Sequence, residues 1–227
     1  MSLKELYNPE SGKMRVAGLM SRSGTNLKKI IEHGRKIEAE EGRAPYQVVV
    51  VFSDNPESNA ETIGKDYEIP VIIRDLGAFH RERGKLRKDL TVRAEFDEGT
   101  VRVLKSFNVN IAAYAGYMSI ATEPLINAFL GVNVHPADLS IMNGEKREYT
   151  GDHAVRDAIL AGEKHLRATT HIIEKKVDYG RILMVSPPLA VTLPKDFNPD
   201  NKDQVKRVSD QHQNRLKEVG DWVIFPR

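Results

Sequence analysis

A run rich in apolar and β-branched residues, 46–52 (YQVVVVF), most limits what this chain can fold into. The run lacks the polar alternation of a half-exposed strand, so it suits a strand buried on both faces of a sheet. Residues 14–20 (MRVAGLM) and 109–115 (VNIAAYA) read as two more apolar strands, and residues 70–73 (PVII) as a shorter one. Strands of this kind are typical of parallel sheets that are covered by helices.

Helical patterns separate these strands. Leu27, Ile30, Ile31 and Ile37 can share one face of a helix that starts near residue 26, and a second helix is expected to end near residue 67. The charged segment 79–107 predicts one long helix, or two helices broken near Gly99. A fifth strand is expected at 131–134. The alternation predicts an α/β fold of three layers, a mostly parallel β-sheet with helices on both faces.

The remainder of the chain completes one expected domain, residues 1–227. Residues 1–13 are expected to form an N-terminal extension. Residues 141–151 are polar and predict a loop, and 152–160 a short helix. The last strands are expected at 168–174 and 181–191, and a helix from about 202 to 222 forms the C-terminal part, 200–227.

Composition narrows the functional classes. The net charge is +2 and the basic residues are spread along the chain, which does not suit a nucleic-acid binder. The absence of cysteine excludes a disulfide framework and a cysteine nucleophile. No apolar stretch reaches the roughly 18 residues of a membrane span. The polar start lacks the apolar region of a signal peptide, so we expect a cytoplasmic protein that binds no membrane.

The first candidate site is the loop of small residues that follows the first strand, SRSGTN. A loop that runs into a helix start directs backbone N–H groups toward an anion, and Gly24 lets the backbone approach it closely. Neither the dinucleotide fingerprint nor the Walker loop is present. The same residues are also typical of a plain helix cap formed by Thr25 or Asn26.

The second candidate is Asn133-Val134-His135-Pro136. Residues two apart in a strand point the same way, so Asn133 and His135 should share a face, and Pro136 should end the strand there. An amide and an imidazole at that place can donate hydrogen bonds to an oxyanion, and the imidazole can also pass on a proton. Alternatively, the two side chains only hold a loop in place.

Asp178, in a turn between two apolar stretches, is the third candidate. Its carboxylate could orient an imidazole or carry a proton, or it is a simple turn aspartate. His171 lies among apolar residues and is interpreted as a core histidine with a satisfied hydrogen bond. No histidine spacing indicates a metal site.

Taken in order, these segments resemble the folate-dependent formyltransferase family. The resemblance covers the chain from about residue 14 to residue 191. The matching segments are SRSGTNL (21–27), VFS (51–53), AGYMSI (115–120), NVHP (133–136) and TTHIIEKKVDYGRIL (169–183). It implies a formyltransferase-like fold with a Rossmann-like N-terminal half.

The resemblance also implies roles for individual residues. Asn133, His135 and Asp178 match the family's catalytic trio. The other implied sites are a phosphate cradle at Ser23, Gly24, Thr25 and Asn26, a folate pocket at Tyr117, Met118, Ser119, Ile120, Ala121 and Val177, and a possible acceptor contact at Gln211. The implied donor is 10-formyltetrahydrofolate, with no metal. The implied acceptor is the amine of glycinamide ribonucleotide, which would make the chain an enzyme of purine biosynthesis and one-carbon metabolism.

Several positions depart from the family pattern, mostly on the acceptor side. They are Arg22, Ser119, the segments 137–140 and 141–150, the pair Asp152-His153, Tyr179 and His212. Two other functions therefore stay open among enzymes, a formyltransferase for another amine and a hydrolase of 10-formyltetrahydrofolate. A non-enzymatic binder of phosphorylated metabolites is a further alternative. The expected partners are small molecules, a phosphorylated amine and a folate, and the chain is expected to be a monomer or a homodimer.

Overall fold

The computed structural model describes residues 7, 8, 10 and 12–227. The predicted N-terminal extension, 1–13, therefore lies partly outside the described residues. The chain divides into two compact units, Met1–Val132 and Asn133–Arg227. The expectation of one domain over residues 1–227 stays a prediction.

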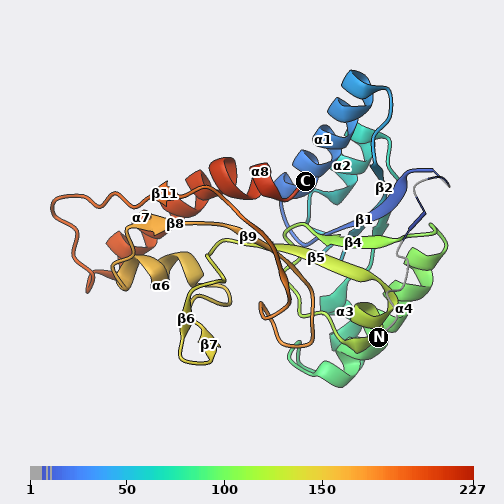
Figure 1. Cartoon of the computed structure of the whole chain (residues 1–227). Helices are drawn as coiled ribbons and strands as arrows, with labels where there is room; N and C mark the ends of the chain where they lie inside the picture. The colour runs from blue at the N-terminus through green and yellow to red at the C-terminus, as the bar shows by residue number, and fades with distance from the viewer. Residues whose placement is uncertain (1–6, 9, 11) are drawn as a thin grey trace. The chain divides into compact units, whose positions relative to one another are not determined.

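The first unit alternates strand and helix as the sequence predicts (Figure 1). Its strands are β1 (Met14–Met20), β2 (Tyr46–Ser53), β3 (Val71–Ile73) and β4 (Ile111–Tyr114). Its helices are α1 (Thr25–Glu41), α2 (Ala60–Tyr67), α3 (Leu76–Glu82), α4 (Leu90–Lys105) and α5 (Glu123–Ala128). β1 pairs in parallel with β2 and β4, and β2 pairs in parallel with β3.

Helices cover both faces of this part of the sheet. α1 and α2 lie on one face, and α3 and α4 lie on the other (Figure 1). Phe52 on β2 is fully buried and packs edge-on against the ring of Phe96 on α4. Leu19 on β1 and Leu27 on α1 are also fully buried. The apolar runs of the sequence therefore form the core between these layers.

The charged segment 79–107 contains two helices, but the predicted break near Gly99 is wrong. The break falls between α3 and α4, where the side chain of Asp89 accepts hydrogen bonds from the backbone N–H groups of Thr91 and Val92 and so begins α4. Gly99 lies inside α4. A Cβ atom there would come within 2.5 Å of the guanidinium of Arg74, so this glycine allows a close side-chain contact within a continuous helix.

Strand β5 (Leu130–His135) contains the boundary between the two units. The second unit continues with the strands β6 (Met142–Asn143), β7 (Lys146–Arg147), β8 (His165–Leu166), β9 (Thr169–Ile172), β10 (Ile182–Val185) and β11 (Leu189–Ala190). Its helices are α6 (Ala154–Leu160), α7 (Lys202–Leu216), a π-helical turn at Lys217–Asp221, and α8 (Trp222–Ile224).

The long strands belong to a seven-stranded sheet with the order β10-β9-β5-β4-β1-β2-β3. The pairings among β1 to β4 are parallel, and β10 pairs with β9 in the antiparallel sense. The predicted fold class, α/β with a mostly parallel sheet, is confirmed.

The second unit differs from the sequence prediction in detail. The segment predicted as a loop at 141–151 contains the short hairpin β6–β7. The strand predicted at 181–191 is two strands, because Pro187 and Pro188 separate β10 from β11 and proline lacks the N–H that a ladder needs. Helix α5 and strand β8 were not predicted. Both are short and lack a clear periodic pattern.

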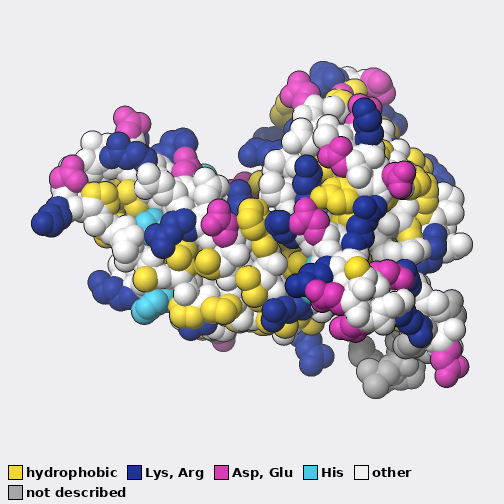
Figure 2. Space-filling view, turned by 90° about the horizontal axis from the view of Figure 1, so that it is seen from above, with side chains coloured by type: hydrophobic (Ala, Val, Ile, Leu, Met, Phe, Trp, Pro, Cys, Tyr) yellow, Lys and Arg dark blue, Asp and Glu magenta, His cyan; other side chains and the backbone are white. Residues whose placement is uncertain are grey.

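The surface carries both signs of charge. On the face that Figure 2 shows, Lys and Arg side chains are interspersed with Asp and Glu. Among the described residues, no helix is long and apolar enough to cross a membrane.

Candidate active site

Asn133 and His135 lie on β5, separated by the buried Val134, as strand alternation predicts. Nε2 of His135 is 2.9 Å from the backbone oxygen of Tyr149. A carbonyl oxygen can only accept a hydrogen bond, so Nε2 of His135 carries a hydrogen and donates a hydrogen bond to the backbone oxygen of Tyr149. The amide nitrogen of Asn133 lies 3.3 Å from Nε2 of His171 on β9.

Asp178 lies in the loop between β9 and β10, and it comes close to His135. Its Oδ2 is 3.5 Å from Nδ1 of His135 and accepts a hydrogen bond of 2.8 Å from the backbone N–H of Gly151. Asp178 has a φ of 58°, a left-handed conformation that costs a non-glycine residue free energy. The second unit therefore brings the three predicted residues Asn133, His135 and Asp178 together.

Arg147, from the hairpin β6–β7, holds the Asp178 loop. Its guanidinium donates hydrogen bonds to the backbone oxygens of Asp178 and Gly180, and its backbone N–H donates to the hydroxyl of Tyr179. A Cβ atom at Gly180 would meet the backbone oxygen of Ile172 at 1.8 Å, so only glycine fits there. The charged segment 141–150 and Tyr179, both departures from the family pattern, thus contact each other through Arg147.

Burial and neighbouring groups shift the proton affinities in this cluster. Burial lowers the pKa of His135, an effect that the nearby charge of Asp178 opposes. Burial alone would raise the pKa of Asp178, but His171, His135 and the N–H of Gly151 together lower it below its usual value. At neutral pH the site therefore combines an ionised carboxylate with a neutral His135.

The sequence interpretation missed His171 as a site residue. It is 1% exposed and its Nδ1 lies 2.8 Å from the oxygen of Ile172, as expected of a satisfied core histidine. Its other nitrogen, however, faces Asn133 and lies 3.5 Å from Oδ1 of Asp178. Its position in the same matching segment, seven residues before Asp178, was the available signal.

The predicted phosphate loop leads into α1 in the first unit. The cap expected at Thr25 or Asn26 is wrong, because Gly24 is the N-cap residue and adopts a left-handed φ of 67°. A Cβ atom at Gly24 would come within 2.4 Å of Ile63, so this turn requires glycine. Ser23 is exposed, and the first turn of α1 follows it.

The predicted folate segment 117–121 lies beside this loop. The hydroxyl of Ser21 donates to Asp54 and accepts the backbone N–H of Met118, and the hydroxyl of Ser119 also donates to Asp54. The buried carboxylate of Asp54 thus joins the two segments. Tyr117 is buried, whereas Met118 and Ile120 are about half exposed, with relative exposures of 51% and 53%.

Other predicted residues lie apart from these clusters. Val177, next to Asp178, is half exposed, and Gln211 is exposed on α7. His212, at a departure from the family pattern, is buried, and its Nε2 accepts the backbone N–H of Thr192. Among residues 7, 8, 10 and 12–227, no group of acidic and histidine side chains could hold a metal ion.

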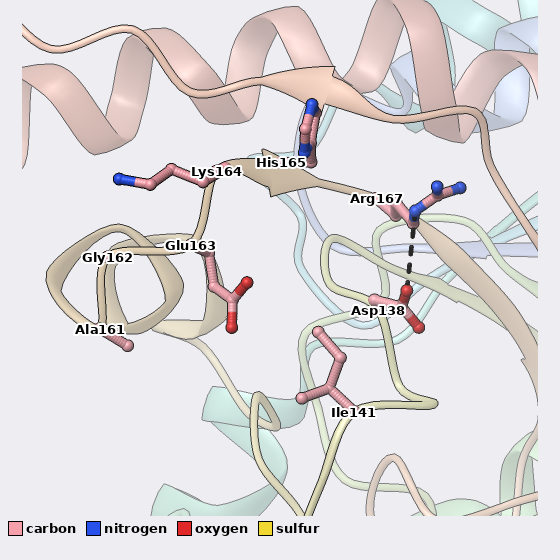
Figure 3. Close-up of a pocket in the computed structure, with 8 residues that line it drawn as sticks. All are labelled: Asp138, Ile141, Ala161, Gly162, Glu163, Lys164, His165 and Arg167. Atoms are coloured by element: carbon pink, nitrogen blue, oxygen red, sulfur yellow. Dashed lines mark ion pairs between the residues drawn. The ribbon is translucent and has the colours of Figure 1, made fainter.

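A pocket of about 320 Å³ adjoins α6 and β8 in the second unit (Figure 3). The carboxylate of Glu163 points into it, and Arg167 forms an ion pair of 3.8 Å with Asp138 at its side. Glu163 accepts a hydrogen bond from the hydroxyl of Tyr149. Burial and the nearby Glu163 raise the pKa of Tyr149 to about 12. Tyr149 thus connects this pocket to His135.

Comparison with known proteins defines the class. The sequence pattern of formyl transferases matches residues 14–218, most of the chain, so this chain belongs to the formyl transferase family.

The chain is also similar to individual proteins with named functions. The trifunctional purine biosynthetic protein adenosine-3 of Drosophila melanogaster is 29% identical over 215 residues, which are 94% of this chain and 13% of that protein. This chain therefore spans a small part of the trifunctional relative. The phosphoribosylglycinamide formyltransferase of Haemophilus influenzae is 28% identical over 172 residues, 75% of this chain and 70% of that protein. The crystal structure of glycinamide ribonucleotide transformylase 1 from Symbiobacterium toebii superposes with a TM-score of 0.68 at 25% identity, covering 94% of this chain and 84% of that one.

Proposed function

We propose that this chain transfers the formyl group of 10-formyltetrahydrofolate to the amine of glycinamide ribonucleotide in purine biosynthesis. The proposal depends above all on one observation, the convergence of Asn133, His135 and Asp178 in the second unit. The names of the relatives from Haemophilus influenzae and Symbiobacterium toebii supply the acceptor.

In the proposed reaction the acceptor amine attacks the formyl carbon directly, and the formyl oxygen becomes an oxyanion. Asn133 is the proposed donor, because one N–H of its amide faces His171 and the second stays available to a ligand. Both ring nitrogens of His135 face acceptor atoms of the protein, so neither is proposed to donate to the oxyanion. The proposed contribution of His135 to stabilising the oxyanion is the positive charge that the ring gains when it takes up a proton.

Asp178 and His135 are proposed to hold the proton in transit. When the new carbon–nitrogen bond forms, the attacking amine must lose a proton, and the leaving nitrogen of the folate must gain one. Nδ1 of neutral His135 has no proton, because Nε2 donates to Tyr149, and it faces Oδ2 of Asp178. A proton can be shared between these two atoms and then returned to the leaving nitrogen, which leaves both side chains unchanged.

The residues predicted to contact the substrates have suitable chemistry. In the first unit Met118 and Ile120 expose apolar side chains, which suits the flat ring system of a folate. The loop 23–26 offers a glycine, two hydroxyl side chains and the start of a helix, whose dipole favours an anion, and this chemistry suits a phosphate. These contacts are part of the proposal.

A single assay tests the function. The protein is incubated with 10-formyltetrahydrofolate, with and without glycinamide ribonucleotide, and tetrahydrofolate release is followed. Release that requires the ribonucleotide supports the proposal. Release without any acceptor indicates a hydrolase. Release with another phosphorylated amine, but not with glycinamide ribonucleotide, indicates a different formyltransferase. If no tetrahydrofolate is released under any of these conditions, a non-enzymatic binder is the remaining alternative.

A further inference from the structure

Asp54 lies directly after the end of β2 and is 1% exposed. A buried carboxyl group needs hydrogen-bond partners, and both of its oxygens have one. Oδ1 accepts a hydrogen bond of 2.7 Å from the hydroxyl of Ser21, which follows β1, and Oδ2 accepts one from the hydroxyl of Ser119, which lies beyond β4. β1 lies between β2 and β4 in the sheet. One buried side chain therefore joins the segments that follow three neighbouring strands.

The segment 115–122, between β4 and α5, forms neither helix nor strand, so side chains determine much of its position. The hydroxyl of Ser21 accepts a hydrogen bond of 2.9 Å from the backbone N–H of Met118. At the other end of the segment, Oδ2 of the buried Asp97 accepts hydrogen bonds of 2.8 and 2.7 Å from the backbone N–H and the hydroxyl of Thr122. The segment is thus anchored to buried groups at both ends.

A buried arginine links the two anchoring carboxylates. The guanidinium of Arg93 lies 3.9 Å from Asp54 and 3.1 Å from Asp97. It also donates a hydrogen bond of 2.6 Å to the hydroxyl of Tyr117, the buried residue of the segment. The same cation therefore holds the anchors and the part of the segment that lies between them.

The anchored segment presents the apolar side chains of Met118 and Ile120, which are about half exposed. A loop that becomes ordered only when a ligand binds loses part of the binding free energy, and a loop that is already held avoids this loss. Contacts far from the reacting atoms are made equally to the substrate and the transition state. The anchoring should therefore affect KM and leave kcat unchanged.

We propose that Asp54 is a positioning residue for the formyl donor, which through Ser21 and Ser119 holds the segment 117–121 in the conformation that receives the folate ring. The inference rests on the proposed function, since it takes this segment as part of the donor pocket. Asp54 itself touches no substrate in this scheme.

Ser119 allows a direct test, because its side chain is only half-buried and its loss should not unfold the protein. Ser119→Ala removes one hydrogen bond to Asp54, so we expect KM for 10-formyltetrahydrofolate to rise roughly fivefold. Both kcat and KM for glycinamide ribonucleotide should stay within about twofold. Ser119→Thr keeps the hydroxyl and should restore KM for the donor to within roughly twofold of the wild type. An unchanged KM for the donor in Ser119→Ala, or an equal rise in Ser119→Thr, would overturn the proposal.

A double-mutant cycle tests whether Ser119 acts through Asp54. Asp54→Leu has the same branched shape but no hydrogen-bonding group, and it leaves Arg93 with Asp97 as its partner. In this background Ser119→Ala should change KM for the donor by less than about twofold, because the hydrogen bond is already lost. A further rise of roughly fivefold would show that Ser119 acts independently of Asp54, and would contradict the proposal. Should Asp54→Leu fail to fold, the two Ser119 variants decide the outcome.

Thr100→Val provides a matched control for the loss of a hydroxyl group. The hydroxyl of Thr100, on α4, accepts a hydrogen bond from Arg74 and donates one to the backbone oxygen of Phe96, and it makes neither of these bonds to the anchored segment. We expect this variant to lower Tm and to leave KM for the donor unchanged. A rise in KM equal to that of Ser119→Ala would show that general stability is responsible, and would contradict the specific role of Asp54.

Hydrogen–deuterium exchange with mass spectrometry tests the anchoring without an activity assay. We expect residues 116–122 to exchange faster in Ser119→Ala than in the wild type, and at the wild-type rate in Thr100→Val. Unchanged exchange in Ser119→Ala would overturn the inference. Absence of formyl transfer by the wild type, with the expected exchange, would instead reject the proposed function.

Discussion

Oδ2 of Asp178 lies 3.5 Å from Nδ1 of His135, and both side chains are almost fully buried. The contact depends on a backbone conformation that aspartate seldom adopts, since Asp178 has a φ of 58°. The N–H of Gly151 on Asp178 and the carbonyl of Tyr149 on His135 hold the two groups in place. This pair is the part of the candidate site for which the structure gives the most detailed predictions.

The first prediction concerns acid stability and Asp178. The fold holds the pKa of Asp178 below its ordinary value of about 3.9, so the folded state favours the charged carboxylate. This stabilisation is fully present above pH ~3.9 and is lost as the pH falls through the lower folded value. We expect Tm of the wild type to exceed that of Asp178→Asn near neutral pH, and the two Tm values to converge only as the pH falls through the lower, folded pKa of Asp178. Circular dichroism melts across this range provide the measurement. A constant difference in Tm at every pH would contradict the prediction.

The second prediction concerns Asn133 as the oxyanion donor. Loss of one such donor typically lowers kcat by roughly a hundredfold to a thousandfold, and we expect this of Asn133→Ala with little change in KM. Its side chain is only half-buried, so Tm should change little. Asn127→Ala, which makes the same chemical change at an exposed position of α5, is the control. Normal turnover in Asn133→Ala would exclude the role.

The third prediction concerns the contact between Arg147 and the Asp178 loop. Arg147→Ala removes the hydrogen bonds to the backbone oxygens of Asp178 and Gly180, so we expect faster amide exchange in residues 176–181 and a kcat about tenfold lower. Hydrogen–deuterium exchange with mass spectrometry measures the first effect. Lys146→Ala, its exposed neighbour, should change neither quantity. Unchanged exchange in Arg147→Ala would show that other contacts hold the loop.

The fourth prediction concerns a buried charge cluster in the first unit. Arg93 is 3.1 Å from Asp97 and 3.9 Å from Asp54, and both carboxylates are fully buried. Arg93→Met would leave these two charges without their cation, which typically costs about 3–5 kcal/mol of the free energy of unfolding. Urea unfolding measures this loss. Arg102→Met, at an exposed position of the same helix, should change stability by less than about 0.5 kcal/mol, and equal effects would contradict the assignment.

Local sequence signals account for much of the fold and for part of the site. Residues 14–20 and 46–52 lie in strands because β-branched and apolar runs suit a buried sheet whatever surrounds them. Strand alternation also predicts that the side chains of Asn133 and His135 share one face of a strand while Val134 is buried on the other. In the structure these residues lie on β5, and Val134 is buried.

Of two signals that depend on distant packing, one was interpreted wrongly and the other incompletely. Gly99 suggested a helix break, but it lies inside α4 because its missing Cβ leaves room for Arg74, which comes from outside that helix. His171 suggested a core residue, and its burial agrees, yet its Nε2 faces Asn133 on another strand. Neither contact can be predicted from the neighbouring residues in the sequence.

The sequence by itself determined the strands β1 to β5 and β9, most of the helices and the chemical groups available, because local propensity and hydrophobic pattern act over a few residues. Only the tertiary structure decided that Asp178 reaches His135, that Arg147 holds the loop that carries Asp178, and that His171 faces Asn133. These contacts join residues that lie 31 to 43 positions apart, as for Arg147 and Asp178 or His135 and Asp178. Such distances are fixed by the packing of whole elements against one another.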